Sequence, residues 1–114
     1  MRTAEIACFT DDVASTRRFY EQLLGAPPEA EWPGGAAFAI GDVTLLVHER
    51  PLRTEPGWPP NEDHVAYGVE DLDRGCADLG ARGLELVVAP RDFPWGRSAY
   101  LRDPDGRLVE LTQA

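Results

Sequence analysis

Three residues that are far apart in the sequence, Glu5, His64 and Glu110, are of types that can bind metal ions and lie in segments with strand character. A carboxylate in the middle of a strand, such as Glu110, faces water, pairs with a cation or binds a metal, because an unpaired buried charge is costly. Two carboxylates and an imidazole would hold a divalent cation and leave coordination positions free for water or substrate. We therefore take these residues as the candidate metal ligands, and Glu110 also as the candidate catalytic residue.

Each of the three residues also has a simpler interpretation. Glu5 lies near the start of its strand and can be solvated, and His64 follows a polar loop and can be a surface histidine. Glu110 can pair with an arginine close to it in the sequence. The arginines in question are Arg97, Arg102 and Arg107.

A repeat within the sequence favours the joint site. Glu5 and His64 are 59 residues apart, and other pairs of similar residues recur at nearly the same spacing. These pairs are the helix caps Asp12 and Asp71, the helix-ending Gly25 and Gly83, and the hairpin glycines Gly41 and Gly106. Counted from the hairpin glycines, Leu45 is the counterpart of Glu110. Such self-similarity indicates two copies of one structural unit.

The elements that position these residues follow the order strand, helix and three strands, twice over. Alternating apolar residues and turn residues predict the strands, and helical spacing of apolar residues after a capping aspartate predicts each helix. The expected strands are 5–9, 30–32, 36–40, 43–48, 64–69, 84–89, 98–101 and 108–112, with helices beginning at about residues 13 and 72. This predicts an α+β fold of two βαβββ modules related by a pseudo-twofold.

Length and composition limit the remaining possibilities. At 114 residues we expect a single domain, with one module over residues 1–50, a proline-rich linker over 51–63 and a second module over 64–114. A net charge of −9 argues against nucleic acid or an anionic membrane as partner. The chain has no apolar run long enough to cross a membrane and no signal-peptide core, so we expect a cytoplasmic protein. Cys8 and Cys76 are expected to be unpaired apolar fillers.

The motifs resemble those of a known superfamily. They are Asp-(x)6-Phe-Tyr-(x)3-Leu-Gly from Asp12, His-Val-Ala-(x)2-Val-Glu-Asp-Leu-Asp from His64, and Asp-Pro-Asp-Gly-(x)3-Glu-Leu from Asp103. Together they are similar to the vicinal oxygen chelate superfamily of glyoxalase I, bleomycin-resistance proteins, extradiol dioxygenases, fosfomycin-resistance transferases and methylmalonyl-CoA epimerase. The resemblance covers essentially the whole chain and indicates the fold more specifically than the function. It implies that the paired modules form a curved mixed sheet around a cavity for a metal or ligand.

The resemblance implies metal ligands on the first and last strands of each module, at Glu5, Leu45, His64 and Glu110. Leucine cannot coordinate a metal, which argues against glyoxalase I activity and favours a three-ligand site. The implied function is that of a metal-dependent lyase, isomerase, dioxygenase or transferase acting on a small substrate with vicinal oxygens. The implied cofactor is Mn, Fe, Ni, Zn or Mg as a divalent ion, with no organic cofactor. Four further residues are expected in the ligand-binding cavity wall: Phe38, Tyr67, Trp95 and Arg97.

The bleomycin-resistance branch offers an alternative that needs no metal. In that interpretation Glu5, His64 and Glu110 are polar cavity residues, and aromatic side chains stack on an antibiotic or another flat ligand. The aromatic residues concerned are Trp32, Phe38, Trp58 and Trp95. The resemblance also implies a homodimer, with residues 51–63 as the hinge if modules are exchanged between subunits.

Overall fold

The computed structural model describes residues 1–50 and 55–114, so the first four residues of the expected linker lie outside the described part. The first module contains strand β1 (Arg2–Thr10), helix α1 (Val13–Leu24) and strands β2 (Ala30–Trp32), β3 (Gly35–Ile40) and β4 (Val43–Glu49). The second contains β5 (His64–Val69), α2 (Leu72–Ala81), β6 (Val88–Phe93), β7 (Gly96–Arg102) and β8 (Leu108–Gln113). The element order therefore repeats, as the sequence predicts.

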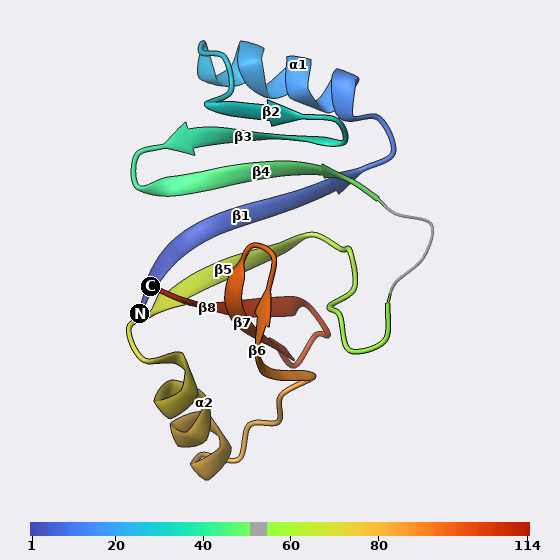
Figure 1. Cartoon of the computed structure of the whole chain (residues 1–114). Coiled ribbons are helices and arrows are strands. Elements are labelled where there is room, and N and C mark those ends of the chain that lie inside the picture. Colours follow the sequence, from blue (N-terminus) through green and yellow to red (C-terminus); the bar gives the residue numbers. More distant parts are fainter. Residues whose placement is uncertain (51–54) are drawn as a thin grey trace.

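All eight strands form one sheet in the order β2-β3-β4-β1-β5-β8-β7-β6. Within each module the first strand runs parallel to the last, as β1 does to β4 and β5 to β8. The two modules meet where β1 and β5 pair antiparallel, along a register that sets Ala7 opposite His64. Figure 1 shows these two strands side by side at the centre of the sheet, with one helix at each end. The α+β class and the curved mixed sheet are confirmed.

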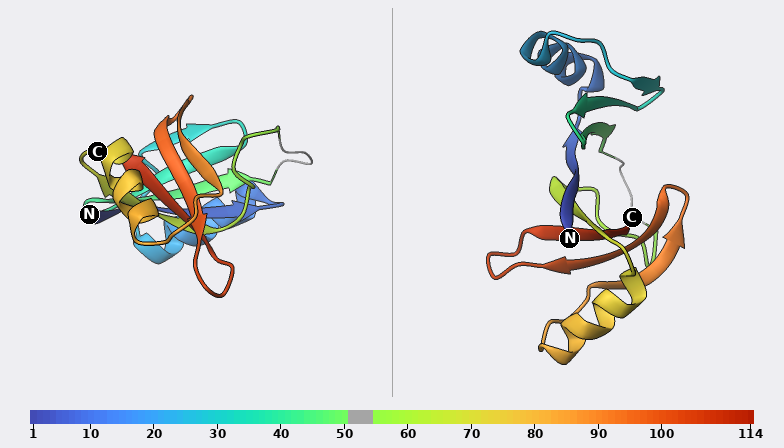
Figure 2. Two further views of the ribbon diagram at one scale, coloured as in Figure 1. Left: turned by 90° about the horizontal axis from the view of Figure 1, so that it is seen from below. Right: turned by 90° about the vertical axis from the view of Figure 1, so that its left-hand side faces the viewer.

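The two helices cover the outer side of the sheet, one over each half (Figure 2). Under α1 lies a buried cluster of Ala36, Phe38, Leu45 and Val47, and under α2 lies a second cluster that includes Leu72, Ala99 and Leu111. Successive side chains of a strand point to opposite faces. The residues between these core positions therefore face the other, inner side of the sheet.

The helix boundaries follow from the capping residues that the repeat picks out. The carboxylates of Asp12 and Asp71 accept hydrogen bonds from the backbone N–H groups of Ser15 and Arg74, as N-caps do. Helix α1 ends at Gly25, whose φ of 68° is accessible to glycine at little cost. No helix in the described ranges is both long and apolar enough to span a membrane.

One strand differs from its expected position. The sequence predicts a strand over 84–89 followed by a loop, whereas β6 runs from Val88 to Phe93 and Leu84 is about half exposed. Pro90 lies within this strand, where the register shifts between Val88 and Arg91. Proline is tolerated there because β6 is an edge strand and its missing N–H leaves no ladder bond unmade.

The segment 55–63 is tied to both modules, and we call it the crossover segment. The backbone N–H of Phe9 on β1 donates to Asp63 over 2.8 Å, and Arg102 on β7 forms a two-pronged ion pair with Glu62. Arg91 on β6 donates to the carbonyl oxygen of Gly57 over 2.9 Å. These bonds hold the crossover segment along one side of the inner face.

Candidate functional site

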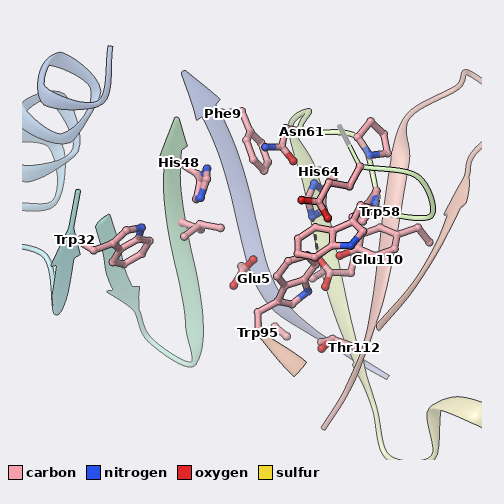
Figure 3. A pocket seen from close by; sticks show the side chains of 17 residues that line it. Glu5, Phe9, Trp32, His48, Trp58, Asn61, His64, Trp95, Glu110 and Thr112 are labelled. Atoms are coloured by element: carbon pink, nitrogen blue, oxygen red, sulfur yellow. Dashed lines mark hydrogen bonds and ion pairs between the residues drawn. The ribbon is translucent and has the colours of Figure 1, made fainter. Parts of the chain in front are cut away.

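The inner faces of β1, β5 and β8 bring the three candidate ligands together. In the strand register Ala66 of β5 lies between Glu5 on β1 and Glu110 on β8, and His64 lies two residues further along β5. Side chains opposite each other in neighbouring strands share a face. Because Ala66 is small, it leaves open the space between the two carboxylates. Figure 3 shows all three side chains on the floor of one cavity.

A β-bulge precedes the first of these residues. The pairing of β1 with β5 shifts between Thr3 and Glu5, so that Ala4 is the extra residue. A bulge changes which way the following side chains point. Both Ala4 and Glu5 consequently line the cavity, although neighbouring strand residues normally face opposite sides.

Glu110 and His64 are held by a chain of hydrogen bonds. Ser98 Oγ donates to Glu110 Oε2 over 2.8 Å, Glu110 Oε1 lies 2.9 Å from His64 Nε2, and His64 Nδ1 lies 2.8 Å from the carbonyl oxygen of Glu62. A carbonyl oxygen can only accept, so Nδ1 carries a hydrogen. Nε2 is thereby directed at Glu110 and the cavity, which is the orientation that a carbonyl partner gives to metal-binding histidines.

The hydrogen bond between His64 and Glu110 is buried. The side chains are only 7% and 6% exposed, and both imidazole nitrogens face oxygen acceptors. Burial lowers the pKa of His64, but the hydrogen bonds to Glu110 and Glu62 and the negative charges of Glu110 and Glu5 outweigh burial and raise it. A metal cation at His64 Nε2 would compete with a proton for that nitrogen.

Glu5 faces the pair without a hydrogen-bond partner of its own among the described residues. Burial raises the pKa of Glu5, the negative charge of Glu110 raises it further, and His64 opposes both. Tyr100, which is opposite Glu110 in the register of β7 and β8, stays protonated because burial and the charge of Glu110 raise its pKa. Two carboxylates and one histidine therefore converge with too little positive charge to balance them.

The donor set suits a divalent cation, but the three side chains are not arranged as a closed site. Within residues 1–50 and 55–114, no group of three His, Cys, Asp or Glu side chains has the spacing of a formed metal site. His64 Nε2 is instead occupied by Glu110. Carboxylate oxygens and a neutral imidazole nitrogen are ligands for ions such as Mn²⁺, Fe²⁺ and Zn²⁺, so the chemistry of the donors fits the group.

The fourth position implied by the resemblance is Leu46, which corrects the expectation of Leu45. Leu46 lines the cavity, whereas Leu45 is 3% exposed and packs under α1. In the register Ala66 lies beside both Glu5 and Glu110, and in the same way Ala7 lies beside both His64 and Leu46. Since His64 is the counterpart of Glu5, Leu46 is the counterpart of Glu110. Leucine at either position supplies no donor, so the three-ligand expectation is unaffected.

The cavity encloses about 690 Å³ and has aromatic walls. Trp58 and Trp95 lie together on one side, and Trp32 lies across the cavity near β3 and β4 (Figure 3). Phe9 and His48 close one end, with their ring centroids 5.6 Å apart. The other lining residues are Ala4, Glu55, Pro59, Pro60, Asn61, Tyr100 and Thr112.

Three of the four residues expected in the cavity wall lie elsewhere, and only Trp95 lines the cavity. Phe38 is buried under α1, and Tyr67 packs against the cluster under α2. Arg97 forms ion pairs with Asp73 of α2 and with Asp92. Tyr67 and Arg97 each neighbour an inward-facing residue, Ala66 and Ser98, so strand alternation turns them to the helix side.

Sequence reasoning missed several inward-facing residues. From the sequence Ser98, which bonds to Glu110, is only part of a predicted strand, and Phe9, His48 and Thr112 are not predicted to line the cavity. Alternation counted from the candidate ligands would have found two of these. Phe9 is four residues after Glu5 on β1, and Thr112 is two residues after Glu110 on β8.

Comparison with known proteins gives the same assignment as the fold. Residues 2–111 match the model of the Glyoxalase/Bleomycin resistance protein/Dioxygenase superfamily, and the chain belongs to this superfamily. It is 26% identical to virulence protein STM3117 of Salmonella typhimurium, over 98% of this chain and 83% of that protein. It is also 26% identical to the glutathione transferase FosA of Serratia marcescens, over 88% and 72% of the two chains.

A solved structure of methylmalonyl-CoA epimerase from Streptomyces coelicolor, in complex with 2-nitronate-propionyl-CoA, superimposes with a TM-score of 0.74. The two chains are 25% identical, and the match covers 100% of this chain and 94% of the epimerase chain. The superfamily and its fold are therefore established, and the relatives include enzymes. Their names differ in the reaction and the substrate, so these have to be argued from the cavity itself.

Proposed function

We propose that this protein is an enzyme that holds a divalent cation with Glu5, His64 and Glu110 and acts on a small molecule bound in the adjoining cavity. The observation that carries the proposal is the chain of hydrogen bonds from Ser98 through Glu110 and His64 to the Glu62 carbonyl at the cavity floor. A buried acid and a buried histidine fixed in this way are costly to keep unless they serve a ligand. The enzymes among the relatives support the same class of function.

Each residue has a definable role in this proposal. Ser98 keeps one oxygen of Glu110 fixed, so the other oxygen points toward the cavity. The Glu62 carbonyl sets the tautomer in which His64 Nε2 is the available ligand atom. When bound, a divalent cation would supply Lewis-acid polarisation of the oxygens of the substrate. Glu5 has no hydrogen-bond partner among the described residues and is free to accept a proton or a metal bond.

Metal binding tests this proposal directly. Protein purified without chelator is analysed for metal content, and the metal-free protein is titrated calorimetrically with Mn²⁺, Fe²⁺, Ni²⁺, Zn²⁺ and Mg²⁺. We expect one cation per chain, with affinity reduced at least about tenfold in Glu5→Gln and Glu110→Gln. Glu85→Gln removes an equal charge at an exposed position outside the cavity and should leave affinity unchanged. Protein that binds none of these ions would refute the metal-dependent function.

The aromatic walls favour one second candidate, a metal-free binding protein for a flat ligand. Phe93 and Trp95 are stacked with ring centroids 4.6 Å apart and planes 2° apart, and Trp58 meets both edge-on. Stacked aromatic surfaces bind planar ligands without help from a metal. In this case metal-free protein should show tryptophan quenching by planar drugs, and Glu110→Gln should bind them equally well. Absence of quenching across a broad panel would count against this candidate.

We also propose that the protein is a homodimer and forms the single domain expected from the sequence. The superfamily assignment supports both. Light scattering at several concentrations would measure the mass in solution, and a mass of one chain at all of them would contradict the dimer.

A further inference from the structure

We propose that the molecule bound in this cavity is an aromatic organic cation, meaning a flat ring system that carries an amine or another positively charged group. The inference rests on the proposed function in one respect: vicinal oxygens on the ring would face the site formed by Glu5, His64 and Glu110. The charge of the ligand follows from separate observations on the walls of the cavity.

One wall is a rigid aromatic surface. Phe93 is stacked on Trp95 with ring centroids 4.6 Å apart, and the guanidinium group of Arg91 is 5.1 Å from the Phe93 ring centroid. Trp58 meets Trp95 at 5.3 Å, and the neighbouring Gly57 is bonded to Arg91. Trp95 is nevertheless 51% exposed, so one large ring face remains available to a ligand. Faces of indole rings attract cations as well as flat apolar groups.

The opposite wall is a third indole, that of Trp32, which packs where a glycine leaves room for it. Trp32 on β2 lies directly over Gly35 on β3, since a Cβ atom added to Gly35 would come within 2.5 Å of Trp32 Cε2. Trp32 is 39% exposed and lines the cavity. A ligand between these walls therefore has aromatic surfaces on both sides (Figure 3).

The fully charged side chains of the cavity lining are carboxylates, and among the described residues its two histidines, His48 and His64, are the groups that can carry a positive charge. The cavity lining contains Glu5, Glu55 and Glu110, and among the described residues it contains no lysine or arginine. Two arginines on nearby strands pair with carboxylates, Arg97 with Asp73 and Asp92 and Arg102 with Glu62. Arg91 lies outside the lining, against Phe93, and donates to the carbonyl oxygen of Gly57. The net charge of −9 extends the negative potential beyond the cavity.

These charges disfavour an anionic ligand. Glutathione and CoA, which are named with two of the relatives, carry carboxylates or phosphates that need cationic partners. Here such groups would meet Glu55 and the aromatic walls, even with a metal ion neutralising Glu5 and Glu110. A positively charged group at the same place gains from the carboxylate and from the indole faces. The cavity is therefore suited to a different class of substrate from those of the two relatives.

A series of catechols that differ only in the charge of their tail tests this inference. Dopamine is a cation, 4-propylcatechol is neutral and 3-(3,4-dihydroxyphenyl)propionate is an anion, while the ring and its vicinal oxygens are the same. Binding is measured by calorimetry and tryptophan quenching, without oxygen, on both metal-free and Zn²⁺-loaded protein. We expect dopamine to bind at least about tenfold more tightly than the anion, with the neutral compound between them. Raising the salt concentration should weaken dopamine binding and not that of 4-propylcatechol.

Variants assign the preference to the cavity. Glu55→Gln should reduce the ratio of dopamine to anion affinity, and Trp95→Leu should weaken all three compounds with the largest loss for dopamine. Glu85→Gln and Phe19→Leu, at exposed positions away from the cavity, serve as matched controls and should change neither the affinity ratio nor the affinity for any of the three compounds. Equal or inverted affinities for cation and anion, or no binding of any compound at millimolar concentration, would overturn the inference. The metal titration is read separately, so a protein that binds none of the metal ions but still prefers dopamine refutes only the metal-dependent function.

Discussion

Replacing Ser98 by alanine removes the only hydrogen bond that the described structure gives to Glu110 Oε2. Ser98 is fully buried, its hydroxyl donates over 2.8 Å, and the Glu110 side chain is 6% exposed. A buried charged acceptor that loses its donor costs about 1.5–3 kcal/mol, and the void left by one oxygen atom is too small to admit water in compensation. For a domain of this length each kcal/mol corresponds to about 4 °C, so the melting temperature should fall by about 6–12 °C.

The assay is urea unfolding of metal-free protein at 25 °C, with Ser15→Ala, the exposed serine of the chain, as control. We expect the Ser15 variant to lie within about 0.5 kcal/mol of the wild type. The Ser98 change is then repeated in Glu110→Gln, whose amide oxygen can accept from Ser98 while its N–H donates to His64. There the loss concerns a neutral hydrogen bond and should shrink to about 1 kcal/mol. Equal costs in the two backgrounds would show that Ser98 does not act through the charge of Glu110.

Three further predictions concern the cavity. The pKa of Glu5 is raised in the folded protein, so at pH values above the ordinary carboxyl pKa the ionised side chain destabilises the fold. Metal-free Glu5→Gln should therefore have a higher melting temperature than the wild type at pH 7 and the same melting temperature at pH 4. Leu46→Glu should keep the fold and tighten metal binding about tenfold or more, whereas Leu45→Glu buries a charge under α1 and should cost more than about 4 kcal/mol in urea unfolding. Gly35→Ala should displace Trp32, shift tryptophan emission and cost about 1–3 kcal/mol.

The repeat in the sequence was sufficient to predict that Glu5, His64 and Glu110 lie close together, because equivalent positions of two similar modules meet at a shared axis. It failed by one residue at Leu45. That offset was counted from the hairpin glycines, but the turn between β3 and β4 is Gly41 and Asp42, whereas the turn between β7 and β8 spans 103–107. Because the two turns differ in length, the spacing between their glycines is not the spacing between equivalent residues of β4 and β8. Only the hydrogen-bond register shows which strand residues are equivalent.

The misplaced wall residues have a different cause. Phe38, Tyr67 and Arg97 have the types expected in a ligand site, but each occupies a strand position that points toward a helix. The type of a residue does not show on which face of a strand it lies, whereas its position in the alternation along the strand does. The hydrogen bond from Ser98 to Glu110 joins neighbouring strands and has no signal in a single sequence.

The antiparallel pairing of β1 with β5 has a consequence for dissection of the protein. This strand pair is the seam between the modules, and the candidate ligands lie on both sides of it, Glu5 on one and His64 with Glu110 on the other. A chain divided between β4 and β5 would yield two halves, neither of which contains all three candidate metal ligands. Association of the two fragments would then measure the stability of the β1–β5 pairing, and a cation bound by ligands from both fragments would favour that association.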